Sequence, residues 1–237
     1  MLGFSNKFSL ILFLSCSMLS YTEENYLMAL LQLTEGEAGK KDAGTNELAT
    51  QLSVKPATAN DMLKKLKEKK LVQYKKYGKS SLTVEGRKKA IEIVRKHRLW
   101  ETFLFEKLEF TWDEVHEVAE QLEHIQSAKL IDKLDSFLNF PKFDPHGDPI
   151  PNAKGELNVL TTTTLANVPV GTHCKVAAVK DNSSAFLKYV DKIGLRIDSR
   201  IKVLAKEDYD DLLQIEVNKM KFAVSQKFAE NILVLSD

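Results

Sequence analysis

Two histidines and two glutamates lie at helical spacing within one short stretch of this sequence: His116, Glu120, Glu123 and His124. Positions i, i+4, i+7 and i+8 of a helix share one face, so this spacing presents two imidazoles and two carboxylates together. These ligand types, with no thiolate, suit a borderline-to-hard divalent ion such as Mn²⁺ or Fe²⁺ better than structural zinc. The pattern predicts a divalent metal site, and a solvated helix face is the alternative.

A second pair at helical spacing, His97 and Glu101, precedes this stretch, so three of the five histidines fall in one region. Catalysis is the other chemistry to consider, because the segment that begins at His116 resembles half of the zinc-protease motif H-E-x-x-H. Its second ligand position holds Glu120 instead of histidine, and the sequence contains no G-x-S-x-G, P-loop or dinucleotide glycine motif. We therefore do not expect an enzyme.

The segment before these residues alternates helical patterns with a short β-ribbon. Thr22 is expected to cap a first helix, Thr45 caps a second, and a third begins at Pro56. Two strand-like runs follow and are joined through Gly78 in a basic hairpin. Two short helices at a tight turn, followed by such a hairpin, predict a winged helix-turn-helix.

Positive charge is concentrated in this same segment. The whole chain has a formal net charge of +1, yet residues 55–89 contain twelve Lys or Arg and three Asp or Glu. The segment therefore carries +9 and the rest of the chain −8, which favours a DNA-binding surface. The start of the third helix can contact bases or phosphates, and the lysines suit phosphates. The candidate DNA contacts are Lys55, Ala57, Thr58, Asn60, Asp61, Lys64, Lys65, Lys75, Lys76 and Lys79.

Helical patterns continue through residues 89–140, and a proline-rich linker follows at 141–157. The helices carry more apolar residues than a small helical layer needs for itself, which predicts a dimer interface. Residues 158–237 hold Val/Ile/Thr-rich runs broken by turns, which predict a small SH3-like β-barrel with one helix at 185–193. The expected fold class is α+β: a winged-helix domain at 18–88, an all-α metal-binding and dimerisation domain, and the barrel.

Residues 1–17 need a separate interpretation. Their apolar run from Phe8 to Leu14 resembles a short signal-peptide core but is too short to span a bilayer. No small-residue cleavage site precedes the next helix, which favours a dispensable extension, or a start assigned too early with Met18 as the true start. The two cysteines cannot form a disulfide framework. We expect a reducing, cytoplasmic location and no membrane partner.

The chain resembles the diphtheria toxin repressor family of iron- and manganese-dependent transcriptional regulators in three stretches. They are V-R-K-H-R-L-W-E-T-F-L, V-H-E-V-A-E-Q-L-E-H and P-H-G-D-P-I-P-N-A-K-G. The resemblance covers roughly residues 20–237 and implies a winged helix, a helical dimerisation domain and a C-terminal FeoA-like barrel. It also implies a metal-activated homodimer that binds a palindromic operator and represses metal-uptake genes.

By position, the resemblance also implies two metal sites. The matching residues are Glu120, Glu123 and His124 for the primary site, His97, Glu101 and His116 for the second site, and Asn25 and Met28 on the first helix. Glu120 stands where iron-responsive members carry cysteine and manganese-responsive members carry glutamate, which mildly favours Mn²⁺ over Fe²⁺. Asn25 replaces the usual Met or Asp, and Met28 replaces the glutamate of the manganese branch.

The main prediction is thus a Mn²⁺- or Fe²⁺-dependent DNA-binding regulator. Metal that bridges the first helix to the dimerisation helices would set the spacing of two recognition helices on successive major grooves. Two alternatives stay open: a winged-helix assembly protein without metal control, and an exported metal-binding protein if residues 1–17 are a true signal. Metal-independent DNA binding would favour the first, and recovery from the cell envelope the second.

Overall fold

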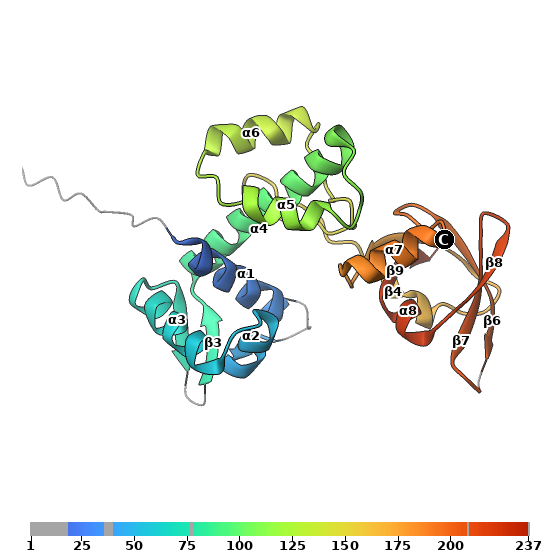
Figure 1. The fold of residues 1–237 in the computed structure, drawn as a ribbon, viewed down its shortest axis with the longest axis horizontal. Helices are drawn as coiled ribbons and strands as arrows, with labels where there is room; N and C mark the ends of the chain where they lie inside the picture. Colours follow the sequence, from blue (N-terminus) through green and yellow to red (C-terminus); the bar gives the residue numbers. More distant parts are fainter. Residues whose placement is uncertain (1–18, 36–39, 76–77, 208, 237) are drawn as a thin grey trace, which may run out of the picture.

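The computed structural model describes residues 19–35, 40–75, 78–207 and 209–236. They form three units in chain order: a mixed α/β unit, a helical unit and a β-rich unit (Figure 1). The predictions for residues 1–17 and Lys76 lie outside these ranges. Within them, no helix is both long enough and apolar enough to cross a membrane.

The first unit combines helices with short strands. Its elements are α1 (Tyr21–Glu35), β1 (Ala43–Gly44), α2 (Thr45–Gln51), α3 (Pro56–Glu68), β2 (Val72–Lys75) and β3 (Lys79–Leu82). The strands form an antiparallel sheet in the order β1-β3-β2, with Tyr74 opposite Ser80. Apolar side chains from the three helices, among them Leu27, Leu48 and Leu63, share one core. The predicted winged helix-turn-helix is confirmed.

Two helix starts differ from those expected. Ser20 caps α1 in place of Thr22: its hydroxyl accepts the amide of Glu23 (3.3 Å), and the Glu23 carboxylate accepts the amide of Ser20 (2.9 Å). This reciprocal pair is a capping box, which satisfies two helix-end donors at once. Thr45 is the first residue of α2, and its hydroxyl donates to the carbonyl of Gly78 (2.9 Å). It therefore ties α2 to the hairpin instead of capping the helix.

The second unit is helical and begins directly after the hairpin. It consists of α4 (Val84–Leu108), α5 (Val115–Leu122) and α6 (Ala128–Phe137). The Thr83 hydroxyl caps α4 by accepting the amide of Gly86 (3.0 Å). A Cβ at Gly86 would lie 1.9 Å from the carbonyl oxygen of Leu71, so only glycine permits this close approach of α4 to the hairpin. One continuous helix thus runs from the first unit into the second.

The third unit is an antiparallel sheet in the strand order β4-β9-β5-β6-β7-β8. Its elements are β4 (Thr163–Thr164), the 3-10 turn η2 (Leu165–Asn167), β5 (His173–Val179), α7 (Ser184–Lys192), β6 (Arg200–Glu207), β7 (Leu212–Val217), β8 (Met220–Val224), α8 (Gln226–Glu230) and β9 (Ile232–Ser236). Val176, Ile201 and Ile215 lie in its buried core. The prediction of one helix is wrong, because the unit contains a second short helix, α8, which Ser225 caps.

The linker and Trp112 attach the third unit to the second. Trp112, from the connection between α4 and α5, is buried in the core of the β-rich unit. In the linker, the carbonyl of His146 accepts the amide of Val179 (3.0 Å). A Cβ at Gly147 would lie 2.0 Å from the carbonyl oxygen of Ala177. Glycine at position 147 therefore lets the linker backbone lie directly against β5.

Candidate metal centre and DNA-binding surface

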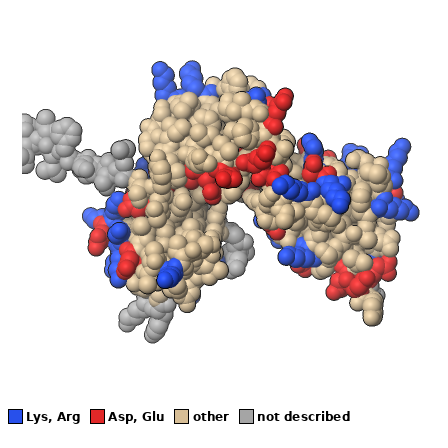
Figure 2. Space-filling model, viewed as in Figure 1, with Lys and Arg blue, Asp and Glu red and all other residues tan. Residues whose placement is uncertain are grey.

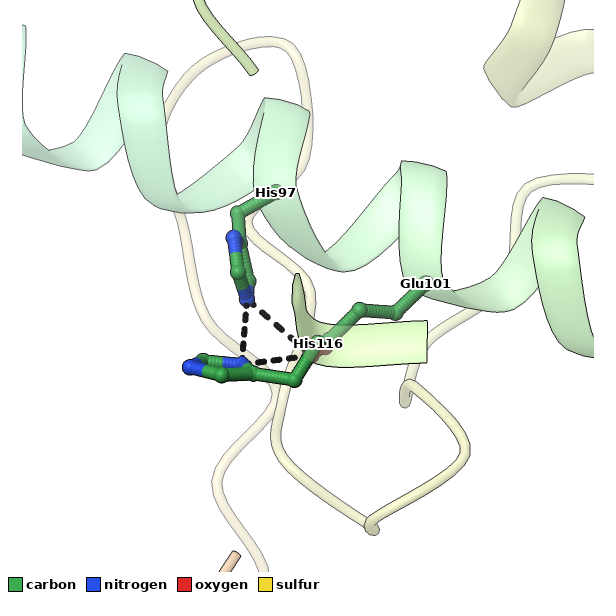
Figure 3. Close-up of side chains that lie close together, drawn as sticks. All are labelled: His97, Glu101 and His116. Carbon is green, nitrogen blue, oxygen red and sulfur yellow. Dashed lines mark hydrogen bonds and ion pairs between the residues drawn. The ribbon is translucent and has the colours of Figure 1, made fainter. Parts of the chain in front are cut away.

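His97, Glu101 and His116 bring three ligand atoms together between α4 and α5 (Figure 3). His97 and Glu101 lie one turn apart on α4, and His116 belongs to α5. The Nε2 of His97 lies 3.0 Å from Oε1 of Glu101 and 3.1 Å from Nδ1 of His116. The Nδ1 of His116 lies 3.1 Å from the same Glu101 oxygen. Two imidazole nitrogens and a carboxylate oxygen converge, which is a ligand set suited to a divalent ion.

The charges in this cluster favour a cation. Burial alone would lower the pKa of His97, but its contacts with Glu101 and Glu123 raise that pKa to about 10. Burial opposes ionisation of Glu101, yet hydrogen bonds with His116, His146 and His97 hold the pKa of its carboxyl well below the usual range. A proton on His97 therefore supplies the positive charge between these carboxylates, and a divalent ion would have to displace it.

Glu123 connects this cluster to another. It is 1% exposed, with Oε2 2.5 Å from Nδ1 of His97 and Oε1 3.7 Å from Nε2 of His124. Glu120 is exposed on α5, with Oε1 3.4 Å from Nε2 of His116. Because α5 ends at Leu122, the predicted single helical face stops before Glu123, and the four residues divide between two clusters.

The second cluster joins the first unit to the helical unit. The Nδ1 of His124 lies 2.5 Å from Oε2 of Glu24 on α1. The side-chain amide of Gln126 donates to Oε1 of the same glutamate (2.8 Å). Tyr21 stacks on His124 with ring centroids 4.2 Å apart. Glu24 is only 4% exposed, so its carboxylate belongs to a buried contact between the two units.

The residue that α1 contributes to this second cluster is Glu24, whereas the family resemblance implied Asn25 and Met28 as the first-helix ligands. Asn25 is exposed, and Met28 packs against the apolar core of the first unit. Successive helix residues point about 100° apart, so neighbours such as Glu24 and Asn25 face different surroundings. Glu24 shares its helix face with the buried residues Leu27 and Leu31. Asn25 and Met28 stay predictions as ligands, and the geometry favours Glu24.

The linker adds two ligand-type residues that the sequence analysis did not single out, Asp144 and His146. A short hairpin places Nδ1 of His146 3.8 Å from Oε2 of Glu101. The Nε2 of His146 lies 3.0 Å from the carbonyl oxygen of Trp112, so a neutral imidazole donates there and keeps its lone pair on Nδ1. Among the described residues, His146 Nδ1 and Asp144 Oδ2 are buried without a hydrogen-bond partner.

These two atoms could bind a metal ion, although Oδ2 of Asp144 also lies 3.6 Å from Nε of Arg98. Burial, reinforced by Glu101 and Asp148, raises the pKa of Asp144 well above its ordinary value, although Arg98 acts in the opposite direction. Burial would lower the pKa of His146, but Glu101 raises it. Buried carboxylate and imidazole atoms without a hydrogen bond carry a free-energy cost that a ligand removes. Glu101, Asp144 and His146 form a group with ligand-like geometry that shares Glu101 with the first cluster.

Three protein-family models match consecutive parts of the chain. The N-terminal DNA-binding domain of iron-dependent repressors matches residues 18–79, their metal-binding and dimerisation domain matches residues 83–152, and the FeoA domain matches residues 163–235. A solved manganese-dependent transcriptional repressor, in complex with manganese, is 35% identical with a TM-score of 0.82, and the match covers 91% of this chain and 100% of that one. The chain belongs to the iron-dependent repressor family.

Curated relatives of this iron-dependent repressor family member cover less of it. Iron-dependent repressor IdeR of Mycobacterium leprae is 32% identical over 130 residues, which are 55% of each protein. A probable metal transport system membrane protein of Chlamydia trachomatis is 44% identical over 71 residues, which are 30% of this chain and 16% of that protein. The chain thus spans about half of IdeR and about a sixth of the chlamydial protein. The predicted family and α+β fold are confirmed.

In this repressor-family chain, the predicted DNA contacts gather on α3 and the hairpin. Figure 2 shows Lys and Arg side chains along the outer edge of the DNA-binding domain, over α3. The exposed members of the set are Lys55, Ala57, Thr58, Asp61, Lys64, Lys65 and Lys79. The side chain of Lys75 and the whole of Lys76 lie outside the described part of the chain.

Two of these candidates have partners that limit their role. Asn60 is half-buried, and its side-chain oxygen accepts the hydroxyl of Tyr74 (3.3 Å). Asp61 forms an ion pair with Lys64 one turn later (3.0 Å), which explains how an acidic side chain is accommodated on a basic helix. As DNA contacts, all ten residues stay predictions.

Proposed function

We propose that this chain is a Mn²⁺- or Fe²⁺-dependent repressor that binds a palindromic operator as a homodimer and regulates metal-uptake genes. One observation carries the proposal: Glu24 on α1 contacts His124 beyond α5, with 2.5 Å between Oε2 and Nδ1. The ligand-type residues therefore join the DNA-binding domain to the dimerisation domain. The role is regulatory, not catalytic, and its place is the cytoplasm, where operator DNA is found.

The residues divide into two candidate metal sites. The proposed ligands are Glu24, Glu120, Glu123 and His124 at the domain junction, and His97, Glu101 and His116, with Asp144 and His146 beside Glu101, inside the dimerisation region. A bound divalent ion supplies two positive charges and directional bonds to these carboxylates and imidazoles. Glu24 adds a first-helix carboxylate that the family resemblance did not imply, and this strengthens the preference for the hard ion Mn²⁺.

The protein's own residues then perform the regulation. Glu24 holds the start of α1 against the end of α5, and α1 packs on α4 and on the helices of the winged helix. Fixing that junction fixes the direction of α3, whose exposed residues Lys55 and Thr58 reach DNA. If metal favours the DNA-competent geometry, DNA must raise the affinity for metal by the same factor.

The dimerisation domain exposes large apolar side chains that a second copy of the chain would cover. Phe137 and Phe140 are 60% and 67% exposed, and Leu108 and Leu130 are also exposed. Large exposed apolar side chains are enriched at protein interfaces. The homodimer would place two winged helices at a defined spacing, which suits two half-sites of one operator.

The test is binding of the full chain to its own promoter-region DNA, followed by fluorescence anisotropy. Mn²⁺ and Fe²⁺, the latter under anaerobic conditions, are titrated against a chelated control. We expect tight binding only with metal and its loss in Glu123→Ala and Glu24→Gln, whereas Glu117→Gln, on the exposed side of α5, binds like the unmodified chain. Equal binding in chelator would overturn the proposal and favour metal-independent assembly.

A further inference from the structure

A crevice of about 690 Å³ lies between the DNA-binding and dimerisation domains, beside the domain-junction metal site. Its walls come from the start of α1, the N-terminal half of α4, the connection from α5 to α6, and the end of the linker. This volume falls within the range of small-molecule sites, which often lie between domains.

The crevice carries an excess of positive charge. Lys88, Lys96 and Lys154 line it, and among the described residues no carboxylate lies within ion-pair distance of their ammonium groups. Its acidic residues, in contrast, are already engaged. Glu24 accepts a hydrogen bond from Gln126, Glu92 pairs with Lys89 (3.1 Å), and Asp132 lies 3.7 Å from Arg95. An anion would therefore find ammonium groups that no carboxylate of the described residues already holds in an ion pair.

Lys96 directly precedes the proposed metal ligand His97 in the sequence. Its side chain is partly buried, and it lines the crevice together with Glu24. An ammonium group held in partly desolvated surroundings without an ion-pair partner gains more from an anionic ligand than one in open water.

The rest of the wall is apolar or suits an anion. Ile91, Ile125 and Ile131 line the crevice, and Ile131 is only 4% exposed. Ser127 and Ala128 place the N-terminus of the ten-residue helix α6 there as well. A helix N-terminus adds partial positive charge and favours an anionic group. The crevice thus combines cationic groups with an apolar surface.

We propose that this crevice binds an anionic organic molecule, a carboxylate or phosphate group on an apolar body, and that its occupancy tightens metal binding. The coupling follows from shared residues, since Glu24 and Gln126 line the crevice and also meet at the metal junction. An anion beside Lys96 offsets a positive charge that repels the incoming metal ion. The binding of the anion does not depend on the proposed function, whereas its coupling to metal binding rests on that function.

The binding is tested with the anionic fluorophore 8-anilinonaphthalene-1-sulfonate and the metal-free full chain. We expect one saturable site per protomer and about a tenfold weaker Kd in the double variant Lys96→Gln/Lys154→Gln. The control Lys227→Gln, an exposed lysine on α8, leaves the Kd unchanged. Competition by octanoate and by octyl phosphate distinguishes a carboxylate from a phosphate ligand. Unsaturable binding, or equal binding in the double variant, overturns the proposal.

DNA backbone is the other anion that these lysines could contact. The same double variant is therefore tested for operator affinity at several salt concentrations. A lower salt dependence of DNA binding together with unchanged fluorophore binding would assign Lys96 and Lys154 to phosphate contacts and overturn the small-molecule site.

The coupling is tested by titrating Mn²⁺ with and without saturating fluorophore, with free Mn²⁺ measured by its electron paramagnetic resonance signal. We expect the Kd for Mn²⁺ to fall about threefold to tenfold, and the Kd for the fluorophore to fall by the same factor in Mn²⁺. Fluorophore binding without any Mn²⁺ binding would contradict the proposed function alone. Binding of both without a mutual effect would overturn the coupling.

Discussion

The two carboxylate–imidazole clusters of this chain differ in what they join. The cluster of His97, Glu101 and His116 lies inside the dimerisation domain, because α4 and α5 both belong to it. The contact of Glu24 with His124 joins that domain to α1 of the DNA-binding domain. The first can form when one domain folds, whereas the second forms only when two domains take one relative position. We therefore expect the first to govern stability and the second to govern DNA-binding geometry.

Replacing Glu24 by Gln should have the largest effect, because it breaks the contact between domains. Glutamine keeps the size of the side chain but loses the charge that a metal ligand needs. We expect the Mn²⁺-dependent affinity for operator DNA to fall about 100-fold, while the metal-free Tm changes by less than about 3 °C. Fluorescence anisotropy measures the affinity and calorimetry measures the Tm.

The neighbouring variant Asn25→Ala is the matched control, because Asn25 lies on the same turn of α1 and is exposed. It should leave both the DNA affinity and the Tm unchanged. A loss of DNA affinity as large as that of Glu24→Gln would make Asn25 a ligand, as the family resemblance implied. Full activity of Glu24→Gln would show that the domain contact does not control DNA binding.

Glu101→Gln should lower the stability more than Glu24→Gln does and the DNA affinity less. The reason is that Glu101 lies among three imidazoles of the dimerisation region. Its loss leaves His97 and His146 without a shared anion in buried surroundings. We expect the metal-free chain to lose about 2 kcal/mol of unfolding free energy, or roughly 4–8 °C in Tm. The loss of DNA affinity at saturating Mn²⁺ should be smaller than for Glu24→Gln. Glu117→Gln, on the exposed face of α5, should change neither value.

Local pattern was sufficient to predict most of the architecture. The helical apolar patterns and the hairpin at Gly78 predicted the winged helix, although the caps expected at Thr22 and Thr45 were wrong. The same kind of pattern could have identified Glu24. It precedes Leu27 and Leu31 by three and seven residues, so it continues their buried stripe. The family resemblance instead implied Asn25. This residue follows Glu24 by one position, so it points away from the buried stripe of Leu27 and Leu31.

Asp144 and His146 could not be predicted in this way. They lie in a proline-rich linker without periodicity, and their approach to Glu101 depends on how that linker folds against the helical domain. The close packing of Gly147 on Ala177 and the burial of Trp112 in the β-rich core decide that position. Contacts between segments so far apart in sequence leave no spacing signal in any one of them. The expected domain boundaries stay predictions. At the first of them, residue 88, the helix α4 continues without a break.

The affinity for Mn²⁺ should rise with pH, because His97 must lose a proton to bind metal. Its pKa of about 10 keeps it protonated from pH 6.5 to 8. We expect the Kd for Mn²⁺ to fall about tenfold per pH unit, with one proton released per ion. The stability of the metal-free fold changes with pH in the opposite direction. Its stabilisation by protonated His97 is complete below pH 6.5 and is lost as the pH rises through about 10.

Calorimetric titration in buffers of different ionisation enthalpy counts the released protons. In His97→Gln the pH dependence should largely disappear, which separates this proton from those of the other imidazoles. An affinity that does not change with pH in the unmodified chain would contradict the ion pair of His97 with Glu101 and Glu123.

Asp144→Asn should give the smallest effect on the metal-free chain and refine the contrast within the Glu101 region. Burial raises the pKa of Asp144, so its ionised form destabilises the fold above the ordinary pKa of aspartate. Asparagine removes that charge while its side-chain oxygen can still accept the amides of His146 and Asp148, as Oδ1 of Asp144 does at 2.8 and 3.0 Å. We expect the metal-free Tm to stay constant or to rise by about 1–3 °C.

The increase in Tm on adding Mn²⁺ should be smaller in Asp144→Asn than in the unmodified chain, because a neutral amide is a weaker ligand. A clear fall in metal-free Tm would instead mean that Asp144 is ionised and paired with Arg98, whose Nε lies 3.6 Å from Oδ2.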